Sequence, residues 1–216
     1  MHHCWSNFNG IHRDPIYEGT AQKRNCRTQE TKAGSKRTEM ITVIENILEE
    51  KDALFAESTM LGNYFPWFIN LETVNDRKKL SNGFDSPQFT HCFVRDGVQA
   101  STQGYGYIDV LMKKIIDLHP KHKLFRVKAN LNVQSSQMGN NHYPAHTDAE
   151  FPCISAIYYV TNSDGDTLFF NKNMEVVQRV VPKRNTLVYF DGGIMHAGMP
   201  PKKSFSRCLI NFVIKP

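Results

Sequence analysis

The second half of the chain is a series of short strand-like segments separated by turns, and this pattern limits the possible folds more than any other feature. The segments from Leu124 onward comprise residues 124–134, 153–160, 167–170, 175–181, 186–190 and 207–214. Gly- and Asn-rich turns such as Gly139-Asn140-Asn141 and Asp191-Gly192-Gly193 separate them. This spacing predicts an antiparallel barrel or jelly roll.

Helical patterns precede the strands. The clearest is Tyr105 to Leu118, where apolar residues recur at helical spacing and form one stripe. A second helix is predicted around Glu49 to Ser58, after a short strand that begins near Ile41. We therefore expect a mainly β fold of the α+β class, with a double-stranded β-helix core (a cupin-like jelly roll) and N-terminal helices packed on one sheet.

The 216 residues suit one domain, and 40% hydrophobic with 22% charged residues is ordinary globular composition. Residues 1–39 carry seven Lys/Arg against four Asp/Glu, whereas the rest of the chain carries nineteen against seventeen. We expect residues 1–39 to be a basic tail of low hydrophobicity and residues 40–216 to form the domain. Because the domain is nearly neutral, nucleic acid is not an expected partner.

The cysteines predict a reducing environment. Their number is five and they form no CxxC pair, which favours free thiols; they are Cys4, Cys26, Cys92, Cys153 and Cys208. The sequence MHHCWSNFNG has no apolar signal-like region, and no apolar stretch approaches the length of a membrane span. We expect a cytoplasmic protein without a membrane partner.

The segment HYPAHTDAEF places His146 and Asp148 two residues apart, so in an extended backbone both side chains point to the same side. An HxD tripeptide alone is weak evidence for a metal site. His196, about fifty residues later in DGGIMHAGMPP, could supply a third ligand. Two imidazoles and one carboxylate favour non-haem Fe(II) over zinc, because three coordination positions stay open. The alternative is that these are separate surface side chains.

Arg207 strengthens the metal interpretation. In the segment RCLINFVI, Arg207, Leu209, Asn211 and Val213 share one face of the predicted last strand. An arginine that faces the interior of a barrel needs an anion, and its guanidinium binds a carboxylate through two parallel hydrogen bonds.

The order HTD, His196, Arg207 resembles the 2-oxoglutarate and Fe(II)-dependent oxygenases, in particular their prolyl 4-hydroxylase-like branch. The resemblance implies that His146, Asp148 and His196 ligate iron and that Arg207 holds the distal carboxylate of 2-oxoglutarate. Tyr159, in CISAIYYVTN, stands where the family often places an aromatic residue that bonds the same carboxylate. GDTLFF resembles the family's Gly-Gly-x-Leu segment, but Asp166 replaces the second Gly, which leaves the local turn uncertain.

Other residues allow two interpretations each. His142 and Glu150 could orient a ligand, although exposed loop positions are favoured. Asn130 and Asn132 alternate with apolar residues and could face the cosubstrate or the solvent. We expect Trp67 to serve packing, and residues 82–103 to form a lid over the metal.

The resemblance implies a 2-oxoglutarate-dependent dioxygenase, which would use O2 to hydroxylate an aliphatic carbon of a prolyl residue or a small molecule and release succinate and CO2. Ascorbate is the expected reductant. One alternative is a jelly-roll metal-binding module without oxygenase activity. Another is a nucleic-acid demethylase, which is disfavoured because Val213 stands where such enzymes carry a second arginine. The substrate and the oligomeric state do not follow from the sequence.

Overall fold

The computed structural model describes residues 41–73, 85–102, 105–134 and 141–216. The predicted basic tail, residues 1–39, lies outside the described residues, so the tail and its boundary with the domain stay predictions. Among the described residues, no helix is both long and apolar enough to cross a membrane.

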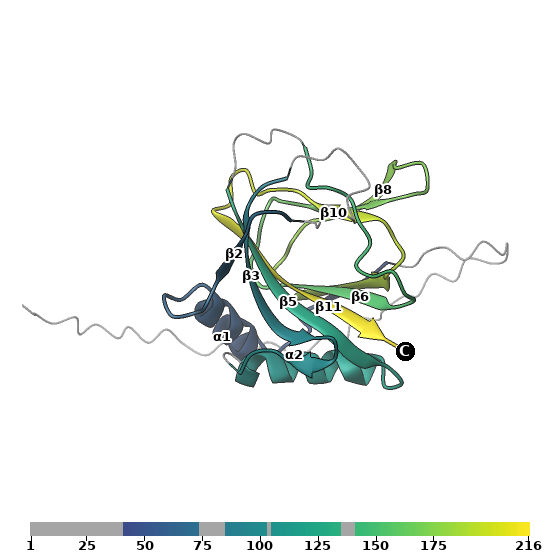
Figure 1. Cartoon of the computed structure of the whole chain (residues 1–216). Helices are drawn as coiled ribbons and strands as arrows, with labels where there is room; N and C mark the ends of the chain where they lie inside the picture. The colour runs from purple at the N-terminus through teal and green to yellow at the C-terminus, as the bar shows by residue number, and fades with distance from the viewer. Residues whose placement is uncertain (1–40, 74–84, 103–104, 135–140) are drawn as a thin grey trace, which may run out of the picture. The chain divides into compact units, whose positions relative to one another are not determined.

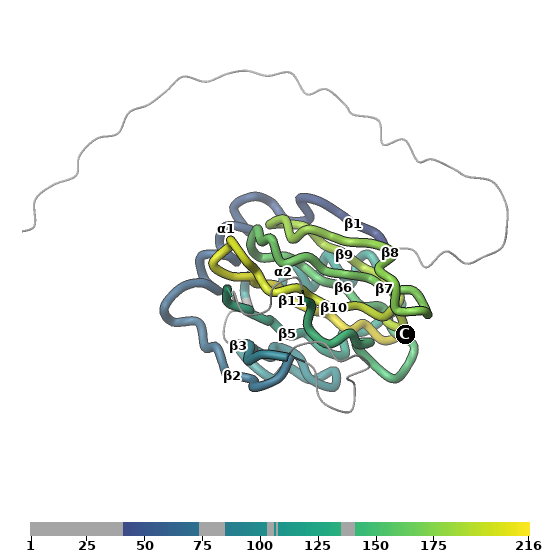
Figure 2. Tube along the Cα trace, turned by 90° about the horizontal axis from the view of Figure 1, so that it is seen from above, coloured from purple at the N-terminus to yellow at the C-terminus, as the bar shows by residue number. Residues whose placement is uncertain are grey.

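A large antiparallel sheet is the main framework of the described chain. Figure 2 shows its strands side by side in the order β1 (Thr42–Glu45), β9 (Thr186–Asp191), β6 (Ile154–Tyr159), β11 (Ser206–Lys215), β5 (Lys123–Val133), β3 (Gln88–Arg95) and β2 (Phe68–Asn70). The short strand β4 (Val98–Gln99) pairs with β3 outside this path. Apart from β2 and β3, neighbours in this order are not consecutive strands of the sequence, which is typical of a jelly roll.

A small sheet lies on one face of the large one and consists of β10 (His196–Gly198), β7 (Thr167–Phe170) and β8 (Val176–Val180). The two helices of the described chain, α1 (Glu50–Met60) and α2 (Tyr105–Leu118), lie on the opposite face (Figure 1). This arrangement confirms the predicted mainly β fold with helices packed on one sheet.

Helix α2 packs on the sheet through the stripe that its sequence predicts. Ile108, Leu111, Met112 and Ile115 are buried in one cluster with sheet residues such as Phe212. Because that stripe would otherwise be exposed to water, its burial holds the helix on the sheet.

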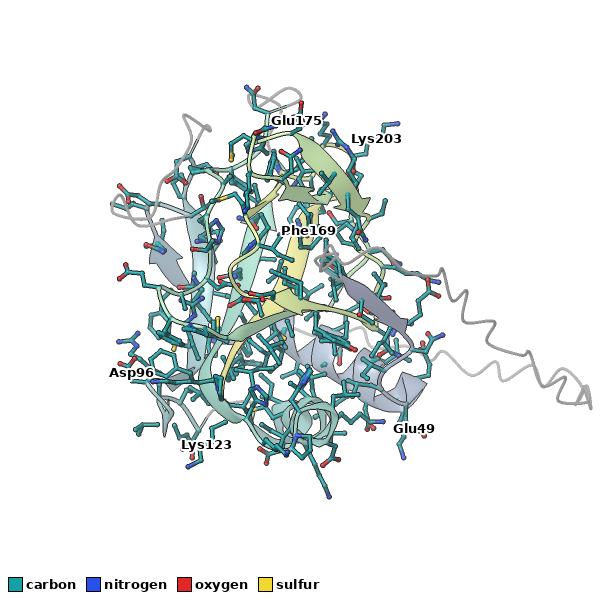
Figure 3. All side chains as sticks on the ribbon, turned by 90° about the vertical axis from the view of Figure 1, so that its right-hand side faces the viewer. Glu49, Asp96, Lys123, Phe169, Glu175 and Lys203 are labelled. Atoms are coloured by element: carbon teal, nitrogen blue, oxygen red, sulfur yellow. The ribbon has the colours of Figure 1, made fainter. Side chains whose placement is uncertain are left out.

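The other face of the large sheet packs on the small sheet through a second core. Ile157, Val188 and Leu209 contribute from the large sheet, and Phe169 contributes from β7. Figure 3 shows Phe169 near the middle of the described fold, between the end marked by Glu175 and Lys203 and the end marked by Asp96 and Lys123. The two cores leave β11 buried on both sides.

Residues 88–95 differ from their prediction. They form β3, which pairs with β5 inside the large sheet, so the lid interpretation is wrong for this segment. A register shift between Cys92 and Val94 breaks the alternation of side chains that would have identified a strand.

Trp67 serves packing as predicted, because it contacts the helix-side core and its indole Nε1 donates to the carbonyl oxygen of Met60 at 2.9 Å.

Candidate metal centre

The fold brings His146, Asp148 and His196 together. Each offers one ligand atom, and the three atoms lie within 4.8 Å of one another. His146 and Asp148 lie in the segment before β6, and His196 begins β10. The backbones of the two histidines form an antiparallel bridge, with each amide donating to the other's carbonyl oxygen at 2.9 and 3.0 Å.

Backbone carbonyls fix the orientation of both imidazoles. The Nδ1 of His146 lies 3.1 Å from the carbonyl oxygen of Pro144, and the Nδ1 of His196 lies 3.1 Å from that of Ile194. A carbonyl oxygen only accepts, so each Nδ1 carries a proton, and in the neutral form of the imidazole Nε2 keeps its lone pair. This is the tautomer that a metal ligand needs.

The protonation states also suit a cation. Burial, with a further contribution from His196, lowers the pKa of His146 to about 4, so the imidazole is neutral at pH 7. Burial alone would raise the pKa of the Asp148 carboxyl, but the neighbouring His196 and Arg126 reverse this effect and hold the pKa well below its usual range. The carboxylate is therefore ionised.

Two further side chains hold Asp148 in place. Arg126 donates to Oδ1 at 2.8 Å, and the amide nitrogen of Asn211 donates to Oδ2 at 3.1 Å. Arg126 also donates to the amide oxygen of Asn211 at 3.2 Å. Asn211 lies on the same face of β11 as Arg207, as the alternation of the last strand predicts, whereas no sequence pattern indicated a role for Arg126.

The three ligand residues open into a cavity of about 370 Å³ between the two sheets. Arg207 and Thr167 line the same cavity. Three ligands from one side with an open cavity on the other match the arrangement that non-haem Fe(II) prefers, whereas a structural zinc site is closed by four ligands. The donor set and its surroundings therefore fit Fe(II).

Arg207 is buried and held by two contacts. Its Nε donates to the carbonyl oxygen of Gly165 at 2.7 Å, and Nη2 donates to the hydroxyl of Thr167 at 2.7 Å. Burial lowers the pKa of the guanidinium, but an arginine remains charged at neutral pH. Because no carboxylate among the described residues forms an ion pair with Arg207 at hydrogen-bond distance, the guanidinium is suited to an anionic ligand.

The comparisons with known proteins agree with this geometry. A family model described as the 2OG-Fe(II) oxygenase superfamily matches residues 133–215, the stretch that contains the two histidines, Asp148 and Arg207. Over these residues the chain is similar to the 2OG-Fe(II) oxygenase superfamily. A sequence search of curated proteins finds no match.

Solved structures share the fold of this chain at low sequence identity. A viral collagen prolyl hydroxylase from Paramecium Bursaria Chlorella virus-1 has a TM-score of 0.55 at 14% identity, covering 84% of this chain and 99% of its own. A prolyl hydroxylase from Trichoplax adhaerens has a TM-score of 0.61 at 14% identity, covering 82% and 84%. An α-ketoglutarate-dependent epimerase from nogalamycin biosynthesis has a TM-score of 0.59 at 11% identity, covering 83% and 77%. These similarities confirm the double-stranded β-helix fold.

Tyr159 lies behind Thr167 as seen from the cavity. The Tyr159 hydroxyl is fully buried and donates to the Thr167 hydroxyl at 2.7 Å, and the cavity lining includes Thr167 but not Tyr159. Thr167 accepts from both Tyr159 and Arg207, so its own hydrogen can be donated to a ligand in the cavity. Thr167 was missed because its role depends on these two long-range contacts.

The turn before β7 forms although Asp166 stands where the Gly-Gly-x-Leu segment has its second glycine. The backbone amide of Met199 donates to the carbonyl oxygen of Asp166 at 2.8 Å, and the side chain of Asp166 points to Arg179. The preceding Gly165 is tightly enclosed, since a Cβ atom there would lie 2.5 Å from the carbonyl oxygen of Met199 and 3.0 Å from Cδ of Arg207.

Replacing Gly165 with alanine should therefore displace Arg207 and weaken the binding of 2-oxoglutarate by about 10-fold, since the charge-assisted bonds of the guanidinium depend on its position. Iron affinity should change little. Gly106→Ala is the control, because a Cβ atom there would meet nothing within 4 Å. Calorimetric titration with 2-oxoglutarate tests this, and an equal affinity in the two variants would contradict it.

Asp164 organises the loop that precedes Arg207. Its carboxylate accepts from the backbone amides of Lys202 and Ser204 at 3.1 Å each and of Lys203 at 2.8 Å. Burial is the largest single effect and would raise the pKa of the Asp164 carboxyl, but these hydrogen bonds together outweigh it and lower the pKa to about 2.

Asp164→Ala should lower the melting temperature at pH 7 by about 2–4 °C, the amount expected for a lost capping interaction of about 1 kcal/mol in a domain of this size. The folded-state pKa lies below the unfolded one, so the carboxylate stabilises the fold above about pH 4, and this stabilisation is lost as the pH falls towards 2. The difference between wild type and variant should shrink as the pH falls from about 4 to about 2. A difference that is constant with pH would contradict this assignment.

The structure also places the other residues for which the sequence allowed two interpretations. Asn130 and Asn132 face the cavity, which decides between the two interpretations left open. Glu150 is exposed, and His142 is half-buried with its Nδ1 beside the carbonyl oxygen of Tyr143. Neither of them belongs to the group of metal-ligating atoms.

Proposed function

We propose that the chain is a 2-oxoglutarate-dependent Fe(II) dioxygenase that hydroxylates an aliphatic carbon and releases succinate and CO2. The observation that carries this proposal is that the His146, Asp148 and His196 ligand atoms and the Arg207 guanidinium open into one cavity. A metal-binding module without oxygenase activity would not need a buried arginine beside its metal.

In this proposal His146, Asp148 and His196 hold the iron, and Arg207 binds the distal carboxylate of 2-oxoglutarate. The Thr167 hydroxyl donates to the same carboxylate, and Tyr159 acts through Thr167 as a positioning residue. The two-point hold on Arg207, by Gly165 and Thr167, keeps its remaining nitrogen donors directed at the ligand.

Fe(II) with bound 2-oxoglutarate supplies the oxidising chemistry, in which O2 is split, the cosubstrate becomes succinate and CO2, and a C–H bond is oxidised. The protein's part is to position and shield the reactants. Asp148 stays ionised because Arg126 and Asn211 bind its oxygens, and His146 stays neutral because it is buried. Both ligands therefore keep their binding form at neutral pH.

The reacting carbon belongs to a prolyl residue of a peptide or to a small molecule. The prolyl hydroxylase from Trichoplax adhaerens was solved with a peptide fragment of hypoxia inducible factor, which supports a peptide as one substrate class. We also propose ascorbate as the reductant and a cytoplasmic location. Free thiols at Cys92, Cys153 and Cys208 support a reducing compartment.

One experiment separates the enzyme from a binding module. Anaerobic protein is loaded with Fe(II) and titrated with 2-oxoglutarate, and the metal-to-ligand charge-transfer absorption of the ternary complex is recorded. Admission of O2 with ascorbate should then produce succinate above the background of protein-free solution. Iron binding without the absorption band or succinate would rule out the dioxygenase and favour the binding module. A rise in succinate with methylated DNA or RNA would instead favour the demethylase.

A further inference from the structure

Asp148 depends on side-chain contacts for its position. The other two ligand residues start from a paired backbone, because the amides and carbonyls of His146 and His196 bond each other. Asp148 lies two residues after His146, at a bend outside the strands of the described chain. Its side chain is only 3% exposed, so the carboxylate is removed from solvent. Other side chains must therefore set the direction of its two oxygens.

Asp148, Arg126 and Asn211 form a closed ring of three hydrogen bonds. Nη2 of Arg126 donates to Oδ1 of Asp148 at 2.8 Å and to Oδ1 of Asn211 at 3.2 Å. Nδ2 of Asn211 donates to Oδ2 of Asp148 at 3.1 Å, which closes the ring. Each residue thus contacts the other two, and a rotation of the carboxylate would break at least one of these bonds.

The two partners of Asp148 lie on neighbouring strands of the large sheet. Arg126 is on β5 opposite Val213 of β11, and Asn211 is two residues before Val213. Both side chains therefore lie on the cavity face. Strand β11 is hydrogen-bonded to β5 on one side and to β6 on the other. The ring thus ties the bend that carries Asp148 to the central strands of the sheet.

The two oxygens of the Asp148 carboxylate differ in their surroundings. Oδ1 accepts the short, charge-assisted bond from Arg126. Oδ2 lies 3.6 Å from Nε2 of His196, the nitrogen that is left to bind a metal. Although Asn211 donates to Oδ2, a carboxylate oxygen has a second lone pair. Oδ2 is therefore the oxygen on the side of the histidine ligands, and Arg126 holds the other one away.

We propose that Arg126 and Asn211 are positioning residues of the metal centre, which orient Asp148 so that it presents one oxygen, Oδ2, to the metal. The inference rests on the proposed function, because the ring has this task only if the three ligand residues hold iron. One carboxylate oxygen and two imidazoles leave three coordination positions open. A carboxylate that bound through both oxygens would take one of them.

Charge and position predict opposite effects of removing Arg126. A guanidinium close to the site repels a metal cation, so by charge alone its loss should strengthen metal binding. Loss of the ring should weaken metal binding, because the released carboxylate has to be ordered again when the metal binds. The side chain of Arg126 is 29% exposed, so solvent screens part of the charge effect. A weaker affinity would therefore identify positioning.

The test measures the affinity of the full-length protein for Fe(II) under anaerobic conditions, by competition with a coloured chelator. Arg126→Met should bind Fe(II) about 10- to 100-fold more weakly than the wild type, the range for groups that support a metal ligand. Arg126→Lys can still donate to Oδ1 but lacks the fork, so its affinity should lie between the two. Arg95→Met is the matched control, since Arg95 is an exposed arginine at the end of β3 and does not line the cavity. It should keep the wild-type affinity.

Asn211→Leu tests the other side of the ring. It removes the bond to Oδ2 and should also weaken Fe(II) binding. The double variant Arg126→Met/Asn211→Leu should lose less affinity than the product of the two single losses, because both residues act on the same carboxylate. Thermal unfolding is measured for each variant, since a role in folding alone would lower the melting temperature and leave the iron affinity of the folded protein unchanged.

The outcomes separate this inference from the proposed function. If the wild type binds no Fe(II), the proposed function itself fails. If the wild type binds Fe(II) and Arg126→Met binds it equally well or more tightly, the positioning role is wrong and the dioxygenase assignment stands. Single losses that multiply in the double variant would also overturn the ring. If Arg126→Met does not fold, wild-type iron affinity in both Arg126→Lys and Asn211→Leu would overturn the inference.

Discussion

Replacing His196 with alanine should abolish iron binding and reduce succinate formation to background. His196 supplies one of the three ligand atoms that lie within 4.8 Å of one another. Because His196 is buried and no other described side chain belongs to this group, the lost nitrogen is not replaced. Changes to groups that only support a metal ligand already cost about 10- to 100-fold in affinity, so the loss of a ligand should cost more than about 100-fold. Iron per chain, measured after anaerobic loading and desalting, gives the result.

His142→Ala is the control for this prediction. His142 is a half-buried histidine four residues before His146, its ring contacts Phe170, and it lies outside the ligand group. The control variant should bind iron as the wild type does. Circular dichroism and thermal unfolding show whether His196→Ala is folded, and a folded His196→Ala protein with wild-type iron content would refute the assignment of the metal site.

Replacing Arg207 with methionine should raise the half-saturating concentration of 2-oxoglutarate by about 30- to 1000-fold. The change removes a buried charge that the carboxylate of the cosubstrate would meet, and losing one partner of such a pair costs about 2–4 kcal/mol. Iron binding should persist, because Arg207 is not among the metal-ligating residues. Titration of the charge-transfer absorption measures the effect separately from turnover.

Arg207→Lys and Arg179→Met complete this test. Lysine keeps the charge but lacks the planar fork, so Arg207→Lys should fall between the wild type and Arg207→Met. Arg179 is an arginine on β8 with 54% of its side chain exposed, and its substitution should leave the titration unchanged. An Arg207→Met protein with wild-type 2-oxoglutarate affinity would remove the basis for the cosubstrate assignment.

The sequence predicted the strands and the helix with strong periodicity. Tyr105–Leu118 is a helix with the bounds expected, and β11 carries Arg207 and Asn211 on the cavity side as its alternation predicted. Strand β3 was missed because a bulge interrupts its alternation, and β10 was missed because three residues are too few to form a pattern. Periodicity thus identified long regular elements and not irregular or short ones.

The candidate site was predictable to the extent that its residues form a motif. His146, Asp148, His196 and Arg207 stand at characteristic spacings, and the structure brings them to one cavity. Arg126 and Thr167 belong to no such motif, because their contacts depend on which strands pair and in which register. Those pairings join segments 22 and 40 residues apart, and one sequence does not disclose them.

Because successive side chains of β5 lie on opposite faces of the sheet, substrate specificity and fold stability depend on different residues of this strand. Val127 and Ala129 are fixed by the core that they fill, while Lys128 and Asn130, which alternate with them along the strand, face the cavity. Substitutions at the cavity-facing positions leave the packed face untouched, so most of them should cost little folding free energy. Related chains could therefore acquire new substrates through a few exchanges on one strand, while the scaffold and the oxidant remain the same.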